Sequence, residues 1–135
     1  MSRRRPIRYG MVGGGPGAFI GEVHRMAARL DGEWTLVAGA FSSDPARSAE
    51  MGEELGLESQ RVYGAFEAMM RSEAELPDDR RMEVVSIVTP NHLHHAVASS
   101  ALRHGFHVVC DKPLTTTVED AEDLCRLAAS ADRIF

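Results

Sequence analysis

The sequence has few basic residues, and one of the two basic types is almost missing. Lysine and arginine total 15 against 20 acidic residues, which gives a formal net charge of −5 at pH 7. We therefore expect no nucleic-acid partner, because binding to nucleic acid requires a basic face. Fourteen of the basic residues are arginine, and Lys112 is the only lysine.

Long hydrophobic runs are also absent. No apolar segment approaches the ~20 residues that span a bilayer, so we expect no membrane partner. The apolar core of an export signal does not follow Arg3–Arg5, and residues 1–6 are predicted to form a solvated tail. Cysteine is scarce as well. Cys110 and Cys125 lack metal-type or redox-type spacing, which favours free thiols in a cytoplasmic protein.

Short apolar runs alternate with amphipathic segments along the whole chain. The apolar runs predict buried strands over 7–12, 34–41, 62–63, 83–89 and 106–110. The segments between them predict helices over 18–30, 45–55, 65–75, 91–104 and from 116 onward. Asp44 is expected to cap the second helix, and a capping box, Thr116-x-x-Glu119, to open the last.

This alternation predicts one α/β domain over 7–135, a doubly wound parallel sheet with helices on both faces. Ile134 and Phe135 resemble the start of a further strand, so we expect the domain to be truncated at its C-terminal end. Ligands of such sheets bind beyond the carboxyl ends of the strands. Four turns therefore become candidates for the functional site.

The first turn is rich in glycine and joins the first strand to the first helix. Gly13, Gly15 and Ala18 match G-x-G-x-x-A, the pattern of a Rossmann fold, in which backbone amides and the helix N-terminus hold a pyrophosphate. Gly21 is the alternative for the third small position. The candidate cofactor-binding residues of this turn are Gly13, Gly15, Gly17, Ala18, Phe19 and Ile20. Phe19 and Ile20 either pack under a nicotinamide ring or begin the helix core.

The second turn lacks the carboxylate that usually binds the ribose hydroxyls of NAD. Phe41 occupies that position. Ser42 and Ser43 can donate to a hydroxyl or a phosphate, and Arg47 either reaches a phosphate or remains an exposed helix residue. Both NAD and NADP therefore stay open as the cofactor.

The third turn carries three histidines within four positions. His92 and His95 share a helix face, but no third ligand follows at suitable spacing, so we predict no metal site. We expect this turn to form a polar rim around the nicotinamide; the alternative is helix capping by Asn91 with exposed histidines. The candidate residues are Thr89, Pro90, Asn91 and His94.

The fourth turn contains the only lysine. Lys112 follows a strand directly and lies between Asp111 and Pro113. Lysine can release a proton near neutral pH when partly desolvated, whereas arginine cannot. We therefore predict that Lys112 bonds a substrate hydroxyl or carbonyl and assists proton movement, and that Asp111 orients it; the alternative is a surface lysine in a turn. Lys112 and Pro113 are also candidate cofactor-binding residues.

Together these turns resemble the glucose–fructose oxidoreductase, inositol dehydrogenase and MocA family. The resemblance rests on the glycine turn, on Thr89-Pro90-Asn91-x-x-His94 and on Gly105-Phe106-His107-Val108-Val109-Cys110-Asp111-Lys112-Pro113, with Asp111 in place of the usual Glu. It implies hydride transfer between NAD(P) and a sugar, cyclitol or related polyol, with Lys112 in the active site. It also implies a C-terminal substrate domain, absent from this chain, that forms a homo-oligomer; this piece alone would then be inactive.

Two other functions stay open. A Rossmann-like methyltransferase has a similar glycine loop but normally an acidic residue where Phe41 lies. A non-catalytic nucleotide-binding or sensing module would keep the fold without the chemistry of Lys112.

Overall fold

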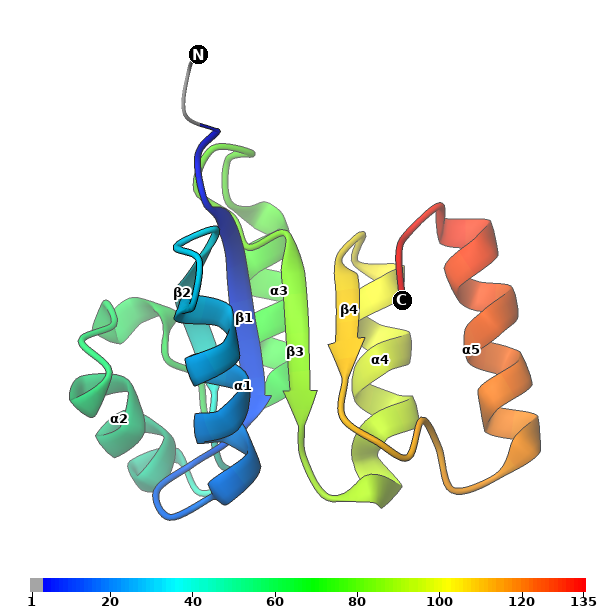
Figure 1. The fold of residues 1–135 in the computed structure, drawn as a ribbon, viewed down its shortest axis with the longest axis horizontal. Helices are drawn as coiled ribbons and strands as arrows, with labels where there is room; N and C mark the ends of the chain where they lie inside the picture. The colour runs from blue at the N-terminus through cyan, green and yellow to red at the C-terminus, as the bar shows by residue number, and fades with distance from the viewer. Residues whose placement is uncertain (1–3) are drawn as a thin grey trace.

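The computed structural model describes residues 4–135, and their central feature is a parallel sheet. Its strands are β1 (Ile7–Gly13), β2 (Trp34–Ala40), β3 (Val84–Val88) and β4 (His107–Cys110). They lie in the order β2-β1-β3-β4, and every pairing is parallel (Figure 1). The order reverses between β1 and β3, which places the switch point of the sheet there.

Helices cover both faces of the sheet, as the sequence predicted. They are α1 (Phe19–Arg29), α2 (Pro45–Glu54), α3 (Phe66–Glu75), α4 (His94–Arg103) and α5 (Val118–Ala131). In Figure 1, α1 lies in front of the sheet, α3 and α4 lie behind it, and α5 packs on α4. The doubly wound α/β architecture is therefore confirmed.

The two cores follow the alternation of side chains along the strands. In β3, Val85 and Ile87 point to the core shared with α3 and α4, whereas Val84 and Val88 point to the core beneath α1 and α2. All four side chains are buried, because successive residues of a strand face opposite sides of the sheet. Ser86 lies on the α1 side by the same rule, and it is also buried.

Some local predictions need correction. Val62 and Tyr63 do not form a strand; Val62 makes one isolated bridge to Gly39, so the described sheet has four strands. Two residues are too few to extend a ladder. Helix α5 is capped by Thr117, whose side chain accepts from the amide of Asp120, and not by Thr116. The helix predicted from Asn91 begins with a 3₁₀ turn, Asn91–Leu93.

Asp44 caps α2 as predicted, through a bond from the amide of Ala46 to its carboxylate. At the other end of the chain, the carbonyl of Ile134 accepts from the amide of Val108 at 3.0 Å. This segment therefore runs back alongside β4, although it forms no assigned strand.

The N-terminal tail is not simply solvated. Arg3 falls outside the described residues, but Arg5 donates to both carboxylate oxygens of Glu83, at 2.8 and 2.9 Å. The amide of Arg8 donates to the same carboxylate at 3.0 Å. This bidentate contact ties the start of the chain to the segment that precedes β3.

Candidate functional site

Three of the four candidate turns lie together beyond the carboxyl ends of the strands. The turns that follow β1, β3 and β4 lie beyond the arrowheads in Figure 1. Gly13 pairs with Val88 at the ends of β1 and β3, so the glycine turn and the Thr89 turn touch at the switch point. This is the position at which open parallel sheets bind ligands.

The glycine turn requires residues without side chains. Gly13 has φ +86°, and a Cβ there would lie 2.8 Å from the carbonyl carbon and oxygen of Val88. A Cβ at Gly15 would lie 2.9 Å from the carbonyl oxygen of Phe41. Gly17 has φ +79° but faces open space. Gly13 and Gly15 therefore let the turn pack closely on the ends of β3 and β2, and at Gly17 no side chain keeps an anion from the backbone.

The N-terminus of α1 offers its amides without an internal competitor. Ala18 is the N-cap residue and makes no side-chain capping bond. The first amides of a helix have no intrahelical acceptor and carry the positive end of the helix dipole. An anion such as a pyrophosphate fits this combination of bare amides and absent side chains.

The third small position of the glycine pattern belongs to Gly21. A Cβ at Gly21 would lie only 2.5 Å from the Cα of Gly14, so Gly21 permits the close packing of α1 on the turn. Phe19 and Ile20 differ in burial, and of the two only Ile20 begins the helix core. Phe19 is 77% exposed at the mouth of the turn, whereas Ile20 packs against the core beneath α1.

The second turn lies beside the glycine turn. Arg47 donates to the carbonyl of Pro16 at 3.0 Å, so its exposed guanidinium lies next to the candidate pyrophosphate site. Phe41 is buried, and the hydroxyl of Ser42 accepts from the amide of Asp44. Ser43 is exposed. No carboxylate occupies the position of Phe41, which leaves both NAD and NADP compatible with the turn.

The third turn corrects the expected position of His94. Its side chain is fully buried, with Nδ1 at 2.7 Å from the carbonyl oxygen of Pro113 and Nε2 at 3.1 Å from that of Thr89. His94 therefore does not line an open rim; it joins the third turn to the fourth. Pro90 and Asn91 are exposed and Thr89 is half-buried. Asn91 begins the 3₁₀ turn, whose N-cap residue is Pro90, and no side-chain bond caps this turn.

The fourth turn separates two residues that were expected to act together. Asp111 Oδ1 lies 3.4 Å from Nε2 of His24, and no ion pair of the described residues joins Asp111 to Lys112. Both residues follow β4, which ends at Cys110, and the Asp111 carboxylate lies on the side of the sheet that α1 covers. Lys112 and Pro113 follow the carboxyl end of β4, and both are exposed.

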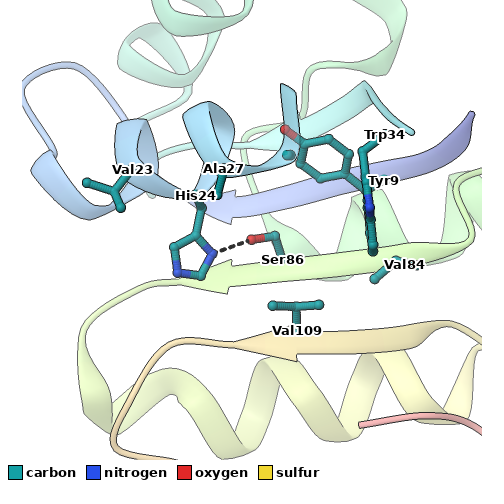
Figure 2. A pocket seen from close by; sticks show the side chains of 9 residues that line it. Tyr9, Val23, His24, Ala27, Trp34, Val84, Ser86 and Val109 are labelled. Carbon is teal, nitrogen blue, oxygen red and sulfur yellow. Dashed lines mark hydrogen bonds between the residues drawn. The ribbon is translucent and has the colours of Figure 1, made fainter. Parts of the chain in front are cut away.

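Sequence reasoning missed the polar group formed by His24, Ser86 and Asp111. Nδ1 of His24 lies 3.0 Å from the hydroxyl of Ser86, as Figure 2 shows. Both residues line an open pocket between α1 and the sheet, whose remaining walls are mostly apolar. The available signal was Ser86 itself, a hydroxyl within the apolar strand Val84–Val88.

Neither cysteine lies in a reactive setting at this edge. Burial, followed by the neighbouring carboxylate of Asp111, raises the pKa of the Cys110 thiol to about 11. Cys125 is exposed on α5.

In residues 4–135, no group of three or more histidine, cysteine or acidic side chains is placed to hold a metal ion. Over the same residues, no helix has the length and apolar character needed to cross a membrane.

The strand order, the glycine-rich turn and the uncapped helix define a dinucleotide-binding domain of the Rossmann type. Residues 7–135 match the family model GFO_IDH_MocA, described as an oxidoreductase family with an NAD-binding Rossmann fold. The chain belongs to this family. The resemblance seen in the sequence is thereby confirmed, and so is the expectation of a nicotinamide dinucleotide as the family's cofactor.

Relatives with solved structures share this fold closely. An oxidoreductase from Sinorhizobium meliloti is 52% identical, with a TM-score of 0.91 over 98% of this chain and 36% of its own. An inositol dehydrogenase homolog from Azotobacter vinelandii, complexed with NAD+, is 45% identical, with a TM-score of 0.92 over 98% of this chain and 33% of its own.

A curated relative gives the same picture. The uncharacterized oxidoreductase YfiI of Bacillus subtilis is 38% identical over 131 residues, which cover 96% of this chain and 33% of that protein. This chain therefore spans about a third of the length of the relatives it matches.

Proposed function

We propose that this chain is the cofactor-binding part of an oxidoreductase that transfers a hydride between NAD(P) and a CH–OH group of a sugar, cyclitol or related polyol. One observation carries the proposal. The uncapped N-terminus of α1 and the glycine turn lie beyond the carboxyl ends of the strands, and so does the turn after β4, which carries Lys112. The helix N-terminus and the glycine turn suit a dinucleotide, and Lys112 supplies a group for proton movement beside it.

The residues at these strand ends have different proposed roles. The amides of Gly15 and of the first turn of α1 would hold the diphosphate, and the Thr89 and Lys112 turns would line the nicotinamide side. When bound, NAD(P) supplies or takes up the hydride. Lys112 is exposed. It would donate a hydrogen bond to the substrate oxygen and accept or return its proton.

The second turn would hold the adenosine ribose of either cofactor. Ser42 and Ser43 suit a hydroxyl or a phosphate, and Arg47 already lies at the glycine turn through its bond to Pro16. A carboxylate would repel the 2′-phosphate of NADP, and Phe41 leaves none at this position. The turn is therefore compatible with either NAD or NADP as the cofactor.

The substrate class follows from the relatives. The Azotobacter protein of known structure is an inositol dehydrogenase homolog, and a polyol substrate fits the hydride chemistry. A homo-oligomer and a cytoplasmic location stay predictions from the sequence.

Ligand titration distinguishes the three candidate functions. We expect NADH or NADPH to gain fluorescence on adding the chain, with NAD+ or NADP+ competing for the same site. Binding of S-adenosylmethionine in place of the dinucleotides would overturn the proposal in favour of a methyltransferase. A protein that contains this domain, binds the dinucleotide and transfers no hydride to any polyol would favour the sensing module.

A further inference from the structure

Arg25 lies beneath the glycine turn with most of its side chain removed from water. The residue is only 8% exposed. Its Nη1 lies 3.3 Å from the carbonyl oxygen of Gly14 and 3.4 Å from the sulfur of Met11. None of the ion pairs formed within residues 4–135 includes Arg25. Buried arginines are usually paired with a carboxylate, so a cation without one needs an explanation.

The position of Arg25 follows from the helix that carries it. Gly21 and Arg25 are the two buried residues of α1, and they lie one turn apart on the same face. Gly21 allows α1 to approach the turn, since a side chain there would meet Gly14. Side chains of a helix lean toward its N-terminus. Arg25 therefore reaches back toward the same glycine.

The contact with Gly14 fixes the direction of the next amide. In a trans peptide the carbonyl and the following N–H point in opposite directions. The Gly14 carbonyl points inward to Arg25, so the N–H of Gly15 points away from the buried guanidinium. Within residues 4–135 this N–H has no hydrogen-bond acceptor. An ordered amide without an acceptor is available to a ligand.

We propose that Arg25 is a binding determinant for the diphosphate of the dinucleotide. It orients the Gly14–Gly15 peptide so that the Gly15 amide faces the ligand, and it places behind the turn a positive charge that forms no ion pair with a carboxylate of residues 4–135. The inference rests on the proposed function, because it assigns Arg25 a role in binding the same cofactor.

Four variants distinguish the effect of orienting the Gly14–Gly15 peptide from the effect of the charge of Arg25 and from a general loss of structure. R25M removes both the bond and the charge, R25Q keeps a donor without the charge, and R25K keeps the charge. R29Q is the matched control, because Arg29 lies one turn further along α1 and is exposed. Circular dichroism and urea unfolding establish that each variant is folded. ADP-ribose and adenosine serve as probes, since only the first contains a diphosphate.

We expect R25M to weaken ADP-ribose binding by about 10-fold or more. R25Q should give a smaller loss and R25K the smallest, while R29Q stays within about 2-fold of the wild type. Adenosine binding should be unchanged in all four. In ¹H–¹⁵N spectra, ADP-ribose should shift the Gly15 amide signal in the wild type and shift it far less in R25M. If R25M does not fold, R25Q and R25K carry the same comparison.

Two results overturn the inference while the proposed function stands. The first is ADP-ribose binding by R25M, or by R25Q if R25M is unfolded, that matches the wild type. The second is an equal loss of ADP-ribose and adenosine binding, which would make Arg25 a purely structural residue. If the wild-type chain itself binds neither ADP-ribose nor NAD(P)H, the proposed function fails as well.

Discussion

His94 joins two turns of the candidate site through its imidazole ring, which lies 2.7 Å from the carbonyl oxygen of Pro113 and 3.1 Å from that of Thr89. The ring is fully buried, and it holds the turn that follows β3 against the turn that carries Lys112. The histidine of the T-P-N-x-x-H motif therefore shapes the site from behind.

The His94→Ala variant should be strongly destabilised. The substitution leaves a cavity and removes the ring N–H donor that serves one of the two carbonyl groups, which together cost about 2–4 kcal/mol. Urea unfolding of the two chains measures this loss. His92→Ala is the matched control, because His92 is an exposed neighbour and its loss should cost less than about 0.5 kcal/mol. Equal stability of the two variants would contradict the role assigned to His94.

Gly21→Ala should separate α1 from the glycine turn. Alanine favours a helix by about 1 kcal/mol over glycine, yet its Cβ would lie 2.5 Å from the Cα of Gly14. We expect a net destabilisation of about 1–3 kcal/mol and weaker NADH binding, measured by urea unfolding and by fluorescence titration. Arg29→Ala, at an exposed position in the last turn of the same helix, should leave NADH binding unchanged and change stability by less than about 0.5 kcal/mol. A Gly21→Ala chain more stable than the wild type would show that the close approach is unnecessary.

Glu83 makes part of the stability depend on pH. Its bidentate bond from Arg5, opposed by partial burial and reinforced by the amide and charge of Arg8, lowers its pKa to about 2. A carboxyl group with a lowered pKa stabilises the fold above the unfolded value of about 4.3, and this contribution disappears as pH falls toward 2. The difference in unfolding free energy between the wild type and Glu83→Gln should be about 1 kcal/mol at pH 6.

That difference should shrink steadily between pH 5 and pH 2 in parallel urea titrations. Glu75→Gln is the control, since Glu75 is exposed on α3. A difference for Glu83→Gln that stays constant over this range would rule out the linkage.

Lys112 is tested in an intact protein that contains this domain. Lys112→Met should lower kcat by about 100-fold or more, while the Kd for NAD(P)H stays within about 2-fold. Lys112→Arg should also remain slow, because arginine keeps the charge but does not release a proton near neutral pH. Steady-state kinetics and fluorescence titration measure the two constants separately. An unchanged kcat in Lys112→Met would remove the lysine from the mechanism.

The features predicted well from sequence are those that depend on local chemistry. The glycine turn was recognisable because a strand, bare backbone and a helix N-terminus follow one another within Ile7–Phe19. The fold followed from the alternation of strands and helices. Asp44 was identified as a cap because its side chain bonds a backbone amide only two residues away.

The features that were missed depend on how α1 packs on the sheet. His24 and Arg25 are adjacent on this helix, and sequence alone does not show that one faces Ser86 and the other the underside of the glycine turn. The expected partnership of Asp111 with Lys112 failed because the Asp111 carboxylate lies near His24 of α1, a contact between residues far apart in the sequence. The burial of His94 likewise depends on contacts with Pro113, 19 residues further along the chain.

A crystal structure of the chain with bound NAD+ would test the central claim most directly. The account predicts that the diphosphate lies against the backbone amides of the glycine turn and of the first turn of α1, with the nicotinamide directed toward Lys112. A diphosphate bound elsewhere on the chain, or residues 13–18 rearranged into continuous helix or strand, would contradict it.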